Sequence, residues 1–248
     1  MAGTNPSLPW KIKQKVLRLY RDGYNAVWTR RTKAVEYPGN LQELQEIIRR
    51  SSRCTDFSDH LIPVFIEGLT CRPRLIVELG TRDGESTFVF ERVARLCGST
   101  LLSVDIDDCL QASSCPAWNF VKSDDVAFAG KFEAWCKSRN IEHEVDLLFI
   151  DTSHLYEHTK AEIKAWLPYM SQAGKVIFHD TNMRLFYRRA DGSLDIGWNN
   201  HRGVIRALEE YFGCRWDETR SFTDARMGWL IRHWPNCSGL TVLDRLPG

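Results

Sequence analysis

Two short stretches of this sequence place an acid beside a histidine directly after an apolar run. Asp151 and His154 follow the run 145–150, and His179 and Asp180 close a second such run. Carboxylates are ligands that Mg²⁺ prefers, and imidazole both suits other divalent metals and accepts protons near neutral pH. The two stretches therefore indicate a catalytic rim that holds a cation and removes a proton. The alternative is ordinary loop polarity, with Asp151 serving only as a helix N-cap.

A glycine-containing loop supplies a second candidate site. The stretch VELGTRDGEST begins at Val77 and leads from an apolar run into a helix-like segment. Gly80 and Gly84 allow a tight turn and a close approach to a ligand, because glycine has no Cβ. The loop has neither the G-x-G-x-x-G fingerprint nor the lysine of a P-loop, and Glu78 and Asp83 would repel phosphate. These features favour a cofactor with a positive centre and no phosphate.

Asp105 ends the next apolar run, where a carboxylate can accept both ribose hydroxyls of a nucleoside. NAD enzymes also place an acid there, so Asp105 indicates a nucleoside without choosing the cofactor. The loop lacks the groups that bind a pyrophosphate, and this absence disfavours NAD as the cofactor and an NAD oxidoreductase as the function.

The elements that must position these residues alternate between strand and helix. The predicted strands are 74–80, 100–105, 119–124, 145–151 and 174–180, and the helices between and after them are 86–98, 125–137, 155–170 and 202–213. Two further strands, 214–222 and 226–234, are predicted to form a hairpin. This alternation predicts the α/β class, with a doubly wound, mostly parallel, seven-stranded sheet whose strand ends carry the ligand. Residues 1–70 are predicted to be a helical extension, and 71–248 the cofactor-binding domain.

Four stretches in this order resemble the class I S-adenosylmethionine-dependent methyltransferases: VELGTRDGEST, LLSVDID, VDLLFIDTSH and KVIFHDTN. The glycine loop is similar to that of the catechol O-methyltransferases. The two acid–histidine stretches are closer to bacterial natural-product and sugar O-methyltransferases grouped with cephalosporin hydroxylase-like proteins. The resemblance covers about residues 74–233. It implies a Rossmann-like methyltransferase fold, S-adenosylmethionine as the cofactor, and Mg²⁺ or Mn²⁺ in the site.

The resemblance also implies a role for each matching residue. The cofactor would be bound by Glu78, Gly80, Thr81, Gly84 and Ser86 at its methionine end, by Asp105 at the ribose, by Ser123 and Asp124 at the adenine, and by Asp151. The metal ligands would be Asp151, His179 and Asp180, and the catalytic base would be His154. The family has Glu-Asp or Asp-Asn where this chain has His179-Asp180. His179 would therefore be a neutral ligand, or Asn182 would supply an oxygen instead.

Two further residues near this rim need an interpretation. His158 lies one helical turn after His154, without the H-E-x-x-H order of a zinc site, and is interpreted as an exposed helix residue. Trp198 lies in the long aperiodic stretch 181–200, which is typical of a lid or a disordered loop.

The composition excludes several classes of protein. Of the 248 residues 43% are hydrophobic and 26% charged, and the formal net charge of +1 argues against a general nucleic-acid-binding surface. No apolar run approaches the ~20 residues of a membrane-spanning helix, and the first residues lack the apolar core of a signal peptide. The eight cysteines form no C-x-x-C pair, so reduced thiols in a cytoplasmic protein are expected.

The N-terminal region is strongly basic. Between Lys11 and Lys33 eight basic residues accompany one acid, Asp22. We interpret this run as the solvated face of a helix whose other side carries Trp10, Val16, Leu17 and Tyr20. A targeting peptide or contact with an anionic surface is the alternative.

The sequence therefore predicts an S-adenosylmethionine-dependent O-methyltransferase assisted by a divalent metal. Its acceptor would be a hydroxyl group of a small molecule: a natural product, a sugar or a phenol. No nucleic acid or membrane partner is expected, and a homo-oligomer is left open. A metal-free N-methyltransferase on the same fold, or a cofactor-binding protein without catalysis, is the alternative.

Overall fold

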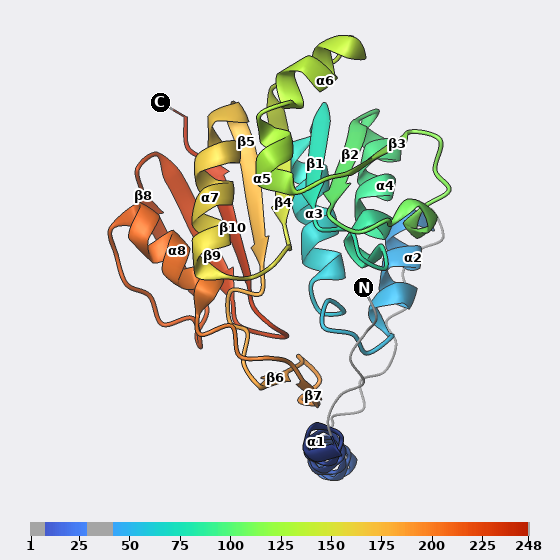
Figure 1. The fold of residues 1–248 in the computed structure, drawn as a ribbon, viewed down its shortest axis with the longest axis vertical. Helices are drawn as coiled ribbons and strands as arrows, with labels where there is room; N and C mark the ends of the chain where they lie inside the picture. The colour runs from blue at the N-terminus through green and yellow to red at the C-terminus, as the bar shows by residue number, and fades with distance from the viewer. Residues whose placement is uncertain (1–7, 29–41, 248) are drawn as a thin grey trace.

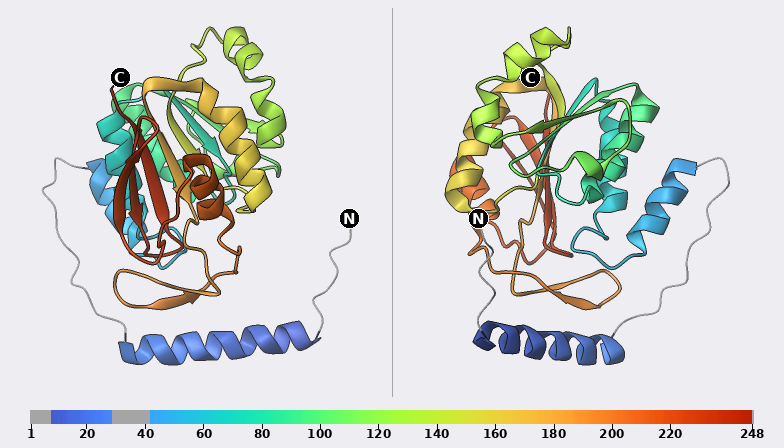
Figure 2. Two further views of the ribbon diagram at one scale, coloured as in Figure 1. Left: turned by 90° about the vertical axis from the view of Figure 1, so that its left-hand side faces the viewer. Right: turned by 45° about the vertical axis from the view of Figure 1, so that its right-hand side comes forward.

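Five of the apolar runs predicted as strands lie side by side in one sheet. They are β1 Leu75–Leu79, β2 Thr100–Asp105, β3 Trp118–Lys122, β4 Val145–Ile150 and β5 Met170–His179. The computed structural model describes residues 8–28 and 42–247, and it has helices on both faces of this sheet (Figures 1 and 2). All five residues of β1 are buried, because helices cover both faces of the strand. Four of the five are apolar, as such a strand requires.

The strand order places a switch point between β1 and β4. Across the sheet the order is β3-β2-β1-β4-β5-β10-β9-β8, and the first five strands in this order are parallel to one another. The chain moves outward from β1 to β3 and then crosses back to β4 on the other side. At this point the Asp151 N–H donates to the Leu79 carbonyl at 2.9 Å. Ligands bind at such a point in doubly wound sheets.

Two layers of helices sandwich the sheet. On one face lie α2 Gln42–Ser51, α3 Leu61–Cys71 and α4 Glu85–Cys97, and on the other lie α5 Asp125–Ala129, α6 Phe132–Ser138, α7 Tyr156–Trp166 and α8 Gly203–Phe212. Each layer encloses its own apolar core against the sheet. The single helix expected over 125–137 is two helices, α5 and α6, separated at Gly130.

The C-terminal part of the sheet differs from the prediction. The hairpin is formed by β8 Phe222–Arg226 and β9 Trp229–Trp234, and a further strand, β10 Leu240–Arg245, lies between β5 and β9. The sheet therefore has eight strands rather than seven. Met227 and Gly228, both with positive φ, form the two-residue turn that suits a twisted hairpin. The strand predicted at 214–222 is wrong, because Trp216 and Glu218 are held by side chains of α8 and its N-terminus rather than by a ladder.

The long stretch after β5 contains a short ribbon against which the first helix lies. The ribbon consists of β6 Phe186–Arg188 and β7 Leu194–Ile196, and the helix is α1 Leu8–Trp28. Figures 1 and 2 show α1 beside this ribbon and apart from the sheet. α2 and α3 pack on the sheet through residues such as Ile47 and Phe65. The division into a helical extension 1–70 and a cofactor-binding domain 71–248 stays a prediction. Among the described residues no helix has the length and apolarity needed to cross a membrane.

Candidate active site

The glycine loop after β1 is held from beneath by Glu78. This carboxylate is fully buried and accepts hydrogen bonds from the hydroxyls of Ser86, Thr87 and Ser103. Burial raises the pKa of Glu78 to about 7, although the three hydroxyls favour its charged form. Glu78 therefore shapes the cofactor pocket through the loop and α4, and its side chain does not line a cavity.

Asp105 at the end of β2 fastens the same loop from the other side. One carboxylate oxygen accepts the N–H groups of Thr81 at 2.7 Å and Arg82 at 3.0 Å, and the other accepts the Asp107 N–H at 2.9 Å. Partial burial would raise the pKa of Asp105, but the backbone N–H groups outweigh it and hold the pKa below its usual value. Asp105 is thus a loop anchor as well as a candidate for the ribose.

Gly80 is the position where the loop meets the switch point. Its φ is +89°, and a Cβ there would come within 2.0 Å of the Asp151 carbonyl oxygen. Only glycine fits, because the loop after β1 and the end of β4 touch through their backbones. Gly80 lines two cavities, one on each side of this backbone contact.

A cavity of about 330 Å³ lies across the carboxyl ends of β1 to β4. Its lining includes the predicted residues Gly80, Asp105, Ser123, Asp124 and Asp151, together with Arg82, Ile106, Asp107, Asp125, Thr152, Ser153 and His158. The lining is acidic, which suits a cationic sulfonium and disfavours phosphate. Ile106 is a largely exposed apolar side chain in this wall. It offers an apolar surface on which the adenine ring of the cofactor could pack.

A smaller cavity of about 140 Å³ continues from Gly80 toward the start of α4. Its lining contains Thr81 and Ser86, both predicted for the methionine end of the cofactor. The Thr81 hydroxyl is buried without a hydrogen-bond partner. A buried polar atom of this kind needs a partner from a ligand or water, so the residues present fit S-adenosylmethionine. Gly84 lies at the N-terminus of α4 against Ala112, outside both linings.

The acid–histidine rim assembles around Asp180. His154 Nδ1 lies 3.1 Å from Asp180 Oδ2 and 3.6 Å from Asp151 Oδ1. Ligand atoms of these three side chains lie within 4.8 Å of one another. Asp180 Oδ1 is buried and forms no hydrogen bond, although His179 Nδ1 lies 3.0 Å away. Two carboxylates and an imidazole fit a divalent cation.

His179 is buried beside this rim and supports it, and its role as a metal ligand stays a prediction. Its Nδ1 donates to Asp151 at 3.2 Å, and its Nε2 lies 2.9 Å from Nδ1 of His60. His60 Nε2 must donate to the Asn236 carbonyl at 3.0 Å, so the other His60 nitrogen accepts from His179. With no cation bound, both nitrogens of His179 therefore carry protons. A cation at Nδ1 would displace that proton and leave the Nε2–H bond to His60 in place.

The pKa directions of the two histidines agree with this arrangement. Burial lowers the pKa of His179, but the Asp180 and Asp151 carboxylates outweigh burial and raise it well above its usual value. Burial and the neighbouring His179 lower the pKa of His60 well below its usual value. His179 is thus a buried cation that partly neutralises the two acids.

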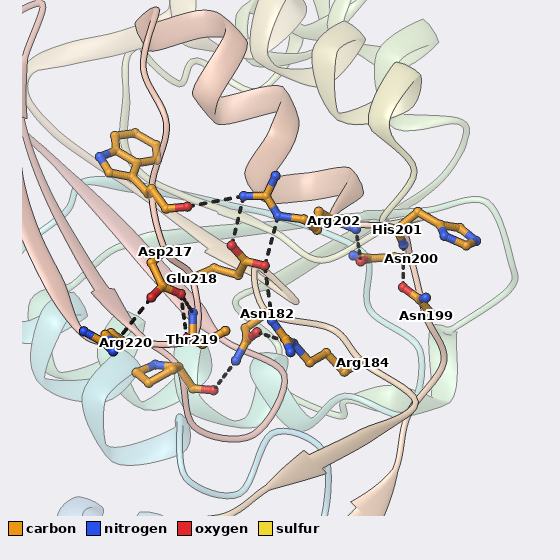
Figure 3. Close-up of polar contacts among 12 residues, drawn as sticks. Asn182, Arg184, Asn199, Asn200, His201, Arg202, Asp217, Glu218, Thr219 and Arg220 are labelled. Atoms are coloured by element: carbon orange, nitrogen blue, oxygen red, sulfur yellow. Dashed lines mark hydrogen bonds and ion pairs between the residues drawn. The ribbon is translucent and has the colours of Figure 1, made fainter.

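Asn182 does not supply a ligand in place of His179. Its side-chain N–H donates to the Pro235 carbonyl at 2.9 Å and its oxygen accepts from Arg184 at 3.2 Å. Figure 3 shows this amide directed toward a polar network in which Glu218 lies between Arg184 and Arg202. The network anchors the segment after β5 to the segment before β8.

His158 differs from its interpretation as an exposed helix residue. Its side chain is 26% exposed, lines the larger cofactor cavity, and bonds through Nε2 to Asp125 at 2.9 Å. The Asp125 carboxylate raises the pKa of His158 to about 9. His158 therefore belongs to the cofactor pocket and lies apart from the Asp151–His154–Asp180 cluster.

A second large cavity, of about 630 Å³, adjoins the first on the side of His154. It shares Arg82, Thr152 and Ser153 with the cofactor cavity, and its remaining lining is Gln14, Asp56, His154, Asp180, Met183, Tyr187, Asp195, Ile196, Gly197, Trp198 and Ser238. The Trp198 ring lies 5.8 Å from that of His154. The N-terminal region and the segment 181–200 supply much of its wall.

Three non-glycine residues of the site have left-handed backbone: Arg82, His154 and Asp180, with φ of 45°, 57° and 56°. Such conformations cost of order 1–3 kcal/mol each and cluster at functional sites. Sequence reasoning missed Arg82, which lines each of the three cavities described above. Its position inside the glycine loop was the available signal. Nothing in the sequence pointed to His60.

Known proteins that resemble this chain include several methyltransferases. Residues 77–181 match a family model described as a methyltransferase domain. MycE, a methyltransferase from the mycinamycin biosynthetic pathway solved with Mg and SAH, superposes with a TM-score of 0.51 at 13% identity over 83% of this chain and 55% of its own. An SAH-bound Podospora anserina methyltransferase gives 0.52 at 12% identity over 99% of both chains. A Bacillus cereus O-methyltransferase with SAH gives 0.50 at 11% identity, over 93% of this chain and 99% of its own.

One curated relative matches a short segment. An uncharacterised Sinorhizobium fredii protein, y4gI, is 45% identical over 40 residues, which are 16% of this chain and 4% of that protein. This chain therefore spans a small part of that relative and about half of MycE.

The domain match and the fold define the class of protein. Residues 77–181 carry a methyltransferase domain, and the strand order is that of a Rossmann-like fold, as the sequence predicts. The chain's resemblance to the O-methyltransferases is confirmed at the level of fold, since solved relatives named as such share it.

Proposed function

We propose that this protein transfers the methyl group of S-adenosylmethionine to a hydroxyl oxygen of a polar small molecule. The observation that carries the proposal is the junction of the two large cavities at Arg82, Thr152 and Ser153. One cavity has the acidic, phosphate-free lining that suits the cofactor. The other contains His154, the side chain best suited to take a proton from an acceptor.

The lining of the acceptor cavity favours a sugar or a similarly hydroxylated natural product. Asp56, Asp195 and Gln14 offer side chains that hydrogen-bond hydroxyl groups, and Trp198 offers a flat apolar surface. Cavities with a few placed polar groups and an aromatic wall select ligands by hydrogen-bond pattern. MycE is a methyltransferase of the mycinamycin biosynthetic pathway. We place this protein in a comparable biosynthetic role in the cytoplasm.

The proposed mechanism assigns proton removal to His154. The Asp180 carboxylate 3.1 Å from His154 Nδ1 favours the proton on that nitrogen and so leaves Nε2 as the basic nitrogen of the neutral ring. Asp180 also stabilises the imidazolium that forms when His154 takes the acceptor's proton. A sugar hydroxyl is a very weak acid, so a positioned base contributes a typical ~10²- to 10⁴-fold in rate. The Trp198 ring beside His154 limits the access of water.

Asp151 and Asp180 would hold a divalent cation such as Mg²⁺ or Mn²⁺, and His154 beside them would stay free as the base. When bound, the cation would lower the pKa of the acceptor hydroxyl. His179 counters part of the negative charge of the two acids, so we expect weaker Mg²⁺ affinity than a site of three carboxylates would have.

The experiment is an assay of S-adenosylhomocysteine release with panels of sugars, phenols and amines. We expect turnover with hydroxylated acceptors, with loss in EDTA and recovery on addition of Mg²⁺ or Mn²⁺. Methylation of amines alone, undiminished by EDTA, would replace this proposal with the metal-free N-methyltransferase. Cofactor binding without turnover of any acceptor would favour a protein without catalysis.

A further inference from the structure

α1 presents its aliphatic face outward. The residues on this stripe recur at intervals of three, four or eight positions, as one face of a helix requires. Their side chains are largely exposed: Ile12 57%, Val16 59%, Leu19 63% and Val27 72%, with Tyr20 57% at the edge of the stripe. Of the apolar residues expected on the side opposite the basic face, Trp10, Val16 and Tyr20 are largely exposed.

Polar contacts hold α1 in this orientation. Arg21 pairs with Asp195 at 2.9 Å, and the Asn25 amide exchanges two hydrogen bonds with the backbone of Leu194, at 2.9 and 2.6 Å. These contacts fix the side of the helix that faces the β6–β7 ribbon, where Gln14 reaches the acceptor cavity. The aliphatic stripe is left without a partner among the described residues.

The basic charge of α1 indicates that whatever covers the aliphatic stripe is anionic. The described helix carries five basic residues and one acid: Lys11, Lys13, Lys15, Arg18 and Arg21 against Asp22. Two copies of the helix packed along their aliphatic stripes would bring like charges together, which is destabilising. An anionic surface with an apolar interior satisfies both the stripe and the basic flanks. Aliphatic side chains beside lysine and arginine are typical of helices lying in a membrane interface.

We propose that α1 binds the surface of an anionic lipid bilayer, with its aliphatic stripe in the acyl boundary and its basic flanks at the headgroups. Binding would leave Gln14 free to line the acceptor cavity, because Gln14 lies on the face of the helix opposite the aliphatic stripe. The proposal replaces the sequence-based expectation of no membrane partner, and it is independent of the chemistry in the site.

The test is flotation of the full chain with phosphatidylcholine vesicles, with and without phosphatidylglycerol. We expect binding to the anionic vesicles, weakened by salt, and little binding to the neutral ones. Val16→Glu combined with Leu19→Glu should reduce the partition coefficient at least ~100-fold, because two aliphatic anchors are lost and two repelling charges are added. Replacing Lys11, Lys15 and Arg18 by Gln should reduce it ~100-fold, at about fivefold per charge.

A matched control is Met227→Glu at the tip of the β8–β9 hairpin. Met227 is an apolar side chain with 65% exposure. Strands β8 and β9, which it joins, lie apart from α1 (Figure 1), so its replacement should leave binding unchanged. Thermal unfolding of all variants should match the wild type, since every replaced side chain is exposed.

Three results would overturn the proposal. One is equal binding of wild type and the Val16→Glu/Leu19→Glu variant to anionic vesicles. A second is equal binding to neutral and anionic vesicles, which would remove the role of charge. The third is a wild-type dimer by light scattering that becomes a monomer in that variant, without vesicle binding, which would assign the stripe to a second copy of this chain.

Discussion

The replacement Asp105→Asn tests the dual role of this residue as loop anchor and ribose acceptor. Asp105 accepts three backbone N–H groups through its two oxygens. An asparagine can keep the Thr81 and Arg82 N–H groups on its single oxygen. Its amide N–H then faces the Asp107 N–H, so at least one of the three bonds is lost and a donor is left against a donor.

The expected cost follows from these contacts. A hydrogen bond to a charged group contributes about 1.5–3 kcal/mol, so we expect a loss of about that size in the free energy of unfolding. In a chain of this length 1 kcal/mol shifts the Tm by about 2–4 °C, which gives a fall of roughly 3–12 °C. Loss of a charged ribose acceptor should also weaken S-adenosylhomocysteine binding by roughly 10- to 100-fold.

Differential scanning fluorimetry and titration calorimetry measure the two effects separately. Asp107→Asn is the matched control, because it removes the same charge from the same cavity while its side chain makes none of these bonds. A lower Tm with unchanged affinity would refute the ribose assignment. Weaker binding at an unchanged Tm would refute the loop anchor.

Three further predictions concern the buried acid, the base and the glycine loop. Glu78 has a pKa of about 7 in the fold against 4.5 when unfolded; the folded state therefore binds more protons between these values, and stability should fall as pH rises from 4.5 to 7, by up to ~3 kcal/mol. Glu78→Gln should remove this slope in urea unfolding, and a slope that persists would contradict the assignment. His154→Ala should lower kcat ~10²- to 10⁴-fold with cofactor affinity retained, whereas His158→Ala should chiefly weaken cofactor binding; the reverse pattern would exchange their roles. Gly80→Ala should abolish cofactor binding, while Gly98→Ala, also at positive φ but with open space around its Cβ, should cost only ~1–2 kcal/mol of strain; equal effects on binding would contradict the close approach to Asp151.

The parallel half of the sheet could be predicted from the sequence because its signals are local. β2 occupies residues 100–105 as predicted, and Gly98 with φ of +72° ends α4 where expected. Apolar runs bounded by glycine and acids suffice when helices cover both faces of a strand. β10 was missed because its place depends on β5 and β9, its neighbours in space, and not on its own pattern.

The site shows the same limit. Asp151, His154 and Asp180 come together as predicted because they end two adjacent parallel strands. The role of His179 depends on His60, which is 119 positions away in the chain, and no local spacing reports such a partner. The choice between ligand and support therefore requires the three-dimensional structure.

The position of β10 has a consequence for synthesis of the chain. β5 exposes a long edge of apolar strand once it has formed, and its eventual neighbour is the last strand to be made. The β8–β9 hairpin emerges earlier but cannot cover that edge, since β10 lies between them. At about 5–20 residues per second, the ribosome needs several seconds to travel from His179 to Arg245. During that interval the unpaired edge can add a strand from another nascent chain, so slow translation after β5 should increase aggregation, and chaperones that cover strand edges should relieve it.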